Sequence, residues 1–158
     1  MVKITELIPS IGSLNEVIDL QKDPTKFIVR ESDELVLISY KRGVTDMNDE
    51  YAHLLRGLIL SKDTLEVVFY GLNKGIDYTE FSNSNAIEDI TIEESIDGTL
   101  LNLYNYNSVW YISTKTIINA ADSKYYSNRS FLDLFMDAKK NYDFNLESLN
   151  KELCYSFV

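Results

Sequence analysis

The closest pair of predicted strands limits the possible folds most. Residues 100–106 and 109–114 are rich in aromatic and β-branched side chains, and only Asn107 and Ser108 separate them. Such side chains favour strands, and a two-residue connection is typical of an antiparallel hairpin. A parallel pair would need a crossover of about a dozen residues. This part of the chain therefore predicts an antiparallel sheet.

The remaining elements repeat this pattern of short strands and polar turns. A capping box at Ser13 and Glu16 predicts a helix over 13–22, Ser130 caps a second helix, and Asn145 starts a short third one. Residues 71–85 read as irregular. Further strands are expected at 26–30, 34–40, 55–60, 65–70, 90–96 and 153–158. One helix, many antiparallel strands and then two helices predict an α+β fold, rich in antiparallel sheet.

The length of 158 residues predicts one domain over 1–158. Residues 1–25 form a helical lead-in, and residues 26–158 form the α+β core. The sequence closes on an apolar run with no polar tail, whereas terminal residues are usually loose at a surface. We therefore expect this to be the N-terminal portion of a longer domain.

Composition excludes several kinds of site. The chain holds one cysteine and one histidine, which excludes a disulfide framework and zinc clusters, so no metal ligands are assigned. We interpret Cys154 as a small core residue and His53 as a structural or surface residue. The net charge of -10 disfavours binding to phosphate backbones by this segment alone. Without an apolar run of about 18 residues or a signal peptide, we expect no membrane partner and a cytoplasmic location.

One segment, 93–104, differs from this background because it carries Asp97-Gly98 between two predicted strands. Taken alone, Asp-Gly marks a turn. The segment, however, follows Arg56-Gly57-Leu58-Ile59 and residues 73–80, and it precedes an aromatic hairpin and then Ser113-Thr114-Lys115. This ordered set resembles the nucleotidyltransferase domain of the phage-type RNA ligase 1 family, within the covalent ligase and capping-enzyme superfamily. The resemblance runs from about residue 34 to the C-terminus.

The resemblance implies a nucleotide site that uses ATP and Mg²⁺. By matching positions, Arg56 is the arginine that approaches the nucleotide, Asp97 and Gly98 follow the nucleophile, and Lys115 is the basic residue after the hairpin. Thr116 replaces the glycine expected next. The same resemblance implies an RNA partner, bound through residues beyond 158.

Residues 70–80, which precede the segment with Asp97-Gly98, can be aligned with the family in two registers. In one register, Lys74 and Glu80 match the family's lysine and glutamate. In the other, Asn73 matches the family's asparagine, and Tyr70 stands where the lysine belongs. Both registers stay open at the level of sequence.

Ser95 stands where the family has its nucleophilic lysine. A lysine amine forms a phosphoramidate with the α-phosphate of ATP, and a protonatable nitrogen leaves readily in the next step. Serine would form an inert phosphodiester. Ser156, with Glu152 nearby, also replaces an acidic residue of a later motif.

These departures predict an inactive RNA-ligase-like domain that acts as a nucleotide-binding or scaffold module. The Glu-Ser-x-Asp-Gly-Thr-Leu core resembles degenerate versions of the family in large DNA viruses, which would place the protein in host cytoplasm or a virion. Two alternatives stay open. One is an active ATP-dependent ligase or nucleotidyltransferase with an engineered nucleophile substitution, and the other is a viral structural or assembly protein with protein partners.

Overall fold

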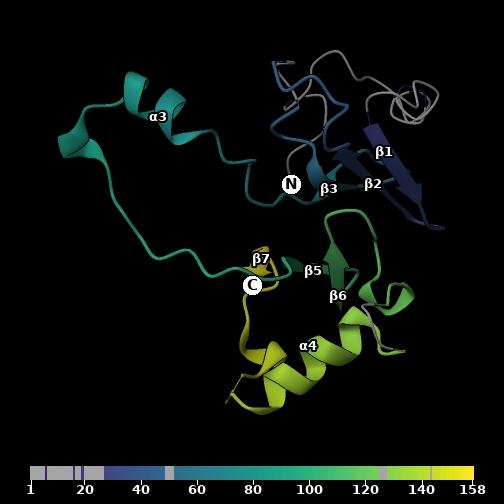
Figure 1. Ribbon diagram of the computed structural model, residues 1–158. Helices are drawn as coiled ribbons and strands as arrows, with labels where there is room; N and C mark the ends of the chain where they lie inside the picture. Colours follow the sequence, from purple (N-terminus) through teal and green to yellow (C-terminus); the bar gives the residue numbers. More distant parts are fainter. Residues whose placement is uncertain are drawn as a thin grey trace.

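The computed structural model describes Glu6, Glu16, Asp19 and residues 27–48, 52–124, 128–142 and 144–158. Within this part, the chain forms two antiparallel sheets and a few helices, so the predicted α+β class is confirmed (Figure 1). Glu16 and Asp19 are helical, but the rest of the helix expected over 13–22 lies outside the described residues.

The first sheet confirms four predicted strands in the order β1-β2-β3-β4. Their bounds are β1 Phe27–Glu31, β2 Leu35–Tyr40, β3 Arg56–Ser61 and β4 Val67–Phe69. Each neighbouring pair is antiparallel. Short turns join β1 to β2 and β3 to β4, as expected for antiparallel pairs, whereas residues 41–55 connect β2 to β3. All six residues of β2 are buried, because this central strand is covered on both faces.

The second sheet contains the predicted hairpin and the C-terminal strand, in the order β6-β5-β7. Strands β5 Leu101–Tyr106 and β6 Val109–Thr114 pair antiparallel, and β7 Tyr155–Phe157 pairs with the other edge of β5. Asn107 and Ser108 both have positive φ, 50° and 65°. Two consecutive positive φ values are the geometry of a two-residue hairpin turn that follows the twist of the strands.

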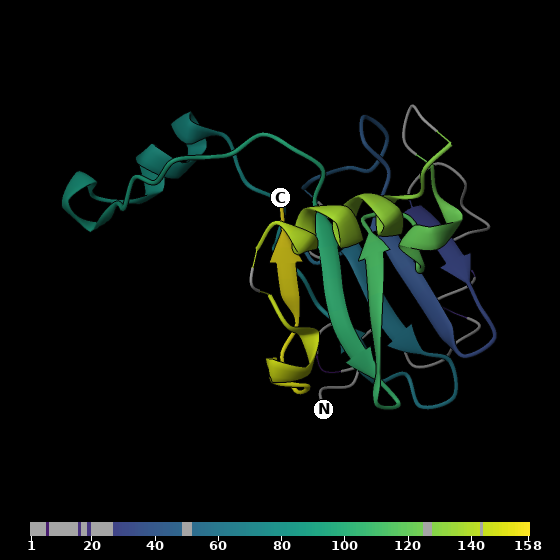
Figure 2. The same cartoon turned by 90° about the horizontal axis from the view of Figure 1, so that it is seen from below.

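Helix α4, Phe131–Lys140, packs on the outer face of the second sheet (Figure 2). Ser130 and Asp133 form a reciprocal capping box at its start, which confirms the predicted cap. The short helix predicted after Asn145 is the 3-10 turn η3, Leu146–Ser148. None of the described helices is long and apolar enough to cross a membrane.

Apolar residues form three clusters that hold these layers together. One covers the outer face of the first sheet, one lies between the two sheets, and one lies between the second sheet and α4. In the middle cluster, Tyr104 of β5 meets Phe69 of β4 with ring centroids 5.8 Å apart. Contacts between strands of different sheets therefore fix how the two sheets face each other.

The prediction of a strand over residues 90–96 is wrong. Residues 91–99 are exposed, and the side chains of Ile92 and Ile96 are 92% and 71% exposed. Their alternation with polar residues suits a strand, but no neighbouring strand pairs with this segment among the described residues. The segment instead runs outside the sheets, together with a helix (Figures 1 and 2).

Two further expectations need correction. The stretch 71–85 is not irregular throughout, because Asp77 caps the helix α3, Tyr78–Ser84, and the turn η1, Ile87–Asp89, follows shortly after. Cys154 is exposed rather than in the core, because it lies just before the short edge strand β7.

Candidate functional site

Arg56 begins β3 next to a bulge in the first sheet. Ser39 pairs with Arg56 while Ile38 pairs with Leu58, so Gly57 is the extra residue, with φ +82°. Such a bulge redirects the neighbouring side chain. The Arg56 guanidinium donates from Nη1 to the carbonyl oxygen of Asn73 at 3.2 Å, while its buried Nε has no hydrogen-bond partner in the described structure.

Lys115 approaches the same bulge from the second sheet. A Cβ on Gly57 would lie 3.0 Å from the Lys115 carbonyl oxygen, so only glycine allows the two backbones to come this close. The Lys115 ammonium lies over the Tyr40 ring, 3.4 Å from its centroid. A cation over an aromatic face is held there by the charge distribution of the ring. Two predicted nucleotide-binding residues, Arg56 and Lys115, thus flank one bulge.

Of the two possible registers, only the one that uses Asn73 places its matched residue in contact with Arg56. Asn73 accepts from Arg56 through its backbone and from the Tyr70 hydroxyl through its side chain. The Lys74 ammonium instead donates to the neighbouring Gly75 carbonyl. Glu80 lies exposed on α3, and among the described residues no hydrogen bond or ion pair links it to Arg56.

Ser95 and Asp97 are not brought to this bulge. Both are exposed, and within the described residues neither makes a hydrogen bond or an ion pair. Gly98 lies instead at the end of β7, where an added Cβ would meet Val158 Cγ1 at 2.9 Å. The structure therefore brings Arg56 and Lys115 to one bulge, whereas Ser95, Asp97 and Gly98 lie on a separate, exposed segment. Lys74 and Glu80 belong to neither group.

Sequence reasoning missed two buried polar side chains beside the first group, Asn102 of β5 and Ser113 of β6. Ser113, Asn102 and Ser156 are cross-strand neighbours on β6, β5 and β7, and Ser156 Oγ donates to Asn102 Oδ1 at 3.3 Å. Ser113 and Ser39 are fully buried, and Ser113 Oγ has no partner among the described atoms. The sequence signal that could have identified these residues is a polar side chain at a position of an apolar strand that faces the core.

The alternation of side chains along β5 and β6 places Asn102 and Ser113 between the two sheets. Asn102 and Ser113 lie two residues from Tyr104 and Tyr111, which pack in the cluster between the sheets, and side chains two apart share a face of a strand. The layer between the sheets thus changes from an apolar core to a polar end. Buried polar groups without partners are uncommon in native proteins and mark sites to test for a ligand.

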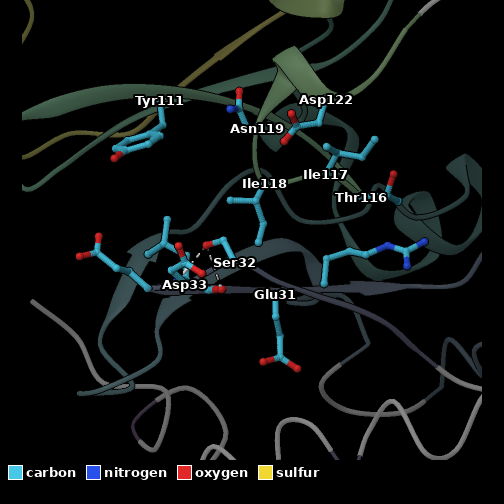
Figure 3. Close-up of a pocket in the computed structure, with 12 residues that line it drawn as sticks. Glu31, Ser32, Asp33, Tyr111, Thr116, Ile117, Ile118, Asn119 and Asp122 are labelled. Atoms are coloured by element: carbon cyan, nitrogen blue, oxygen red, sulfur yellow. Dashed lines mark hydrogen bonds between the residues drawn. The ribbon is translucent and has the colours of Figure 1, made fainter.

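Two cavities formed by the described residues lie elsewhere, and neither is lined by Arg56, Lys115, Ser95 or Asp97. One, of about 730 Å³, opens between the β1–β2 turn and residues 116–122 (Figure 3). The other, of about 840 Å³, lies beside β4 and includes Tyr70 and Cys154. Across the described ranges, no group of three His, Cys, Asp or Glu residues is arranged to hold a metal ion.

The comparisons with known proteins are sparse. No family model matches the chain, and no solved structure matches it. The chain is similar to a protein of Invertebrate iridescent virus 3 described as an "Immediate-early protein ICP-46 homolog", with 24% identity over 127 residues. That match covers 73% of this chain and 28% of the viral protein, so the chain corresponds to a limited part of this longer viral relative.

Proposed function

We propose that this chain is the N-terminal portion of an RNA-ligase-like nucleotidyltransferase domain that has lost covalent adenylation and serves as a nucleotide-binding or scaffold module. The observation that carries the proposal is the bulge at Gly57. At this bulge the backbone next to Arg56 in β3 closely approaches the backbone of Lys115, which follows β6 of the other sheet, and the resemblance assigns both residues to the nucleotide. The order of the motifs along the sequence supports the same interpretation.

The residues at the bulge suit the phosphates of ATP. Arg56 carries a buried Nε–H without a protein acceptor, and a guanidinium binds phosphate oxygens through several donors at once. Lys115 supplies a second positive charge. A Mg²⁺ ion does not fit this site, because the predicted acidic residue, Asp97, is exposed and does not lie at the bulge with Arg56 and Lys115. We therefore assign no step to the metal.

Ser95 accounts for the loss of covalent chemistry. Its hydroxyl would need a base to become a nucleophile, and it makes no hydrogen bond in the described structure. An adenylyl group on serine would be a phosphodiester, which lacks the protonatable nitrogen that makes the lysine adduct reactive. The domain would hold a nucleotide without passing on its adenylyl group.

One alternative is a viral structural or assembly protein that keeps the fold without binding nucleotide. The similarity to a viral immediate-early protein supports a viral source for the chain and does not favour this alternative over the nucleotide-binding module. An active ligase with an engineered Ser95 is the other alternative. An RNA partner, protein partners and a cytoplasmic location remain predictions.

Thermal unfolding with and without ATP and magnesium tests the proposal. We expect ATP to raise the melting temperature of the chain, because a ligand that binds only the folded state stabilises it. Arg56→Gln should remove most of that rise. Lys139→Gln, which removes the same charge on α4, should keep it. No rise in the unaltered chain, or an equal loss in both variants, would contradict the nucleotide site.

A further inference from the structure

The cavity between the β1–β2 turn and residues 116–122 has an apolar floor. Leu35 and Ile118 are 3% and 9% exposed and belong to the core cluster between the sheets. Tyr111 is half-buried beside them and stacks on Tyr104, with ring centroids 5.6 Å apart. The volume of about 730 Å³ lies within the range of sites that accept a small molecule or a few side chains.

Both walls of this groove are held by local hydrogen bonds. On one side, Ser32 Oγ accepts from the Leu35 backbone N–H at 3.1 Å, which closes the turn that carries Asp33. On the other side, Asn119 caps the turn η2, Ala120–Asp122, and accepts from the Ala121 N–H at 3.0 Å. The groove is thus preformed rather than dependent on a loose loop.

Carboxylates dominate its rim. Asp33, Glu34 and Asp122 line the groove, and Arg30 is the one basic residue in its lining. Glu31 points away from the groove and is paired with Lys62 at 3.0 Å (Figure 3). Asp33 and Asp122 lie on opposite sides of Ile118 in the same view. An apolar floor between acidic walls is complementary to an apolar side chain flanked by positive charges.

We propose that this groove binds a short basic segment of a separate protein, which seats one apolar side chain on Leu35, Tyr111 and Ile118. Its lysine or arginine residues face Asp33, Glu34 and Asp122. A second copy of this chain is a poor occupant, because each copy has a net charge of -10. A nucleic acid is also disfavoured, since its phosphates would face three carboxylates. This proposal is independent of the nucleotide site.

Fluorescence anisotropy with a labelled peptide tests the groove. The probe has a central leucine flanked on each side by lysine and arginine, and a matched probe has glycine at the centre. We expect the leucine probe to bind more tightly than the glycine probe. The double variant Asp33→Asn with Asp122→Asn should weaken the leucine probe about fivefold, the size expected for two exposed ion pairs.

The control removes the same charge elsewhere. Glu93→Gln with Glu94→Gln changes two exposed carboxylates outside the groove and should leave binding within about twofold, since distant exposed charges are screened by salt. Equal weakening by both double variants would show attraction by net charge alone and would overturn the proposal. No difference between the leucine and glycine probes would also overturn it.

Chemical-shift mapping on the unaltered chain provides a second measurement that needs no variant. The leucine probe should move backbone amide signals of residues 31–35 and 116–122, which form the two walls. Shifts confined to other surfaces would overturn the assignment of the groove.

Discussion

Replacing Gly57 with alanine tests the close approach between β3 and the residue after β6. Gly57 has φ +82°, a left-handed conformation that costs an L-residue about 1–2 kcal/mol. The new Cβ would also lie 3.0 Å from the carbonyl oxygen and 3.2 Å from the Cα of Lys115. Because these are backbone atoms, relief requires the sheets to shift, and such overpacking typically costs about 1–3 kcal/mol. We expect a total loss of about 2–5 kcal/mol in the free energy of unfolding.

Gly43 supplies the matched control. It has φ +75°, but nothing lies within 4 Å of the Cβ that alanine would add. Gly43→Ala should therefore lose only the conformational part, about 1–2 kcal/mol. Urea unfolding followed by circular dichroism measures both losses, with an unchanged slope indicating that the denatured states are comparable. Equal destabilisation by the two substitutions would refute the close approach.

Three further predictions concern stability. Ser130→Ala should lower the free energy of unfolding by about 1 kcal/mol in urea titrations, because it removes the N-cap of α4. Hydrogen bonds from Ser130 hold the pKa of Asp133 below its usual value. The stabilisation of the fold by this carboxylate should therefore be present near neutral pH and decrease as the pH drops through the acid range. A free energy of unfolding that does not change over that range would contradict this prediction. Leu103→Ala should cost about 2–5 kcal/mol because Leu103 is fully buried, whereas Ile92→Ala should change stability by less than about 0.5 kcal/mol.

Local sequence patterns predicted most of the strands. The β5–β6 hairpin follows from a two-residue turn between aromatic runs, and the start of α4 follows from the cap at Ser130. Both depend on residues close in sequence. The strand expected at 90–96 failed for the opposite reason. Alternating side chains identify a potential strand face, but a strand also needs a neighbour for its backbone hydrogen bonds, which the pattern does not supply.

The sequence motifs named two residues that lie at the bulge, Arg56 and Lys115, but not the buried polar side chains Asn102 and Ser113. Motif order identified Arg56 and Lys115, and the structure places them at one bulge. Motif order did not identify Gly57 as the residue that contacts the Lys115 backbone, because that contact joins two different sheets. The groove lined by Asp33 and Asp122 was missed for the same reason, since its walls come from turns about 90 residues apart in sequence.

Native mass spectrometry of the chain with ATP and magnesium tests the central claim most directly, because one sample reports both bound and covalently attached nucleotide. We predict a complex with ATP under native conditions and an unmodified chain after denaturation, since Ser95 does not support adenylyl transfer. Arg56→Gln should lose the complex, and Lys139→Gln should retain it. An adenylyl group that survives denaturation, or no complex under native conditions, would contradict the account.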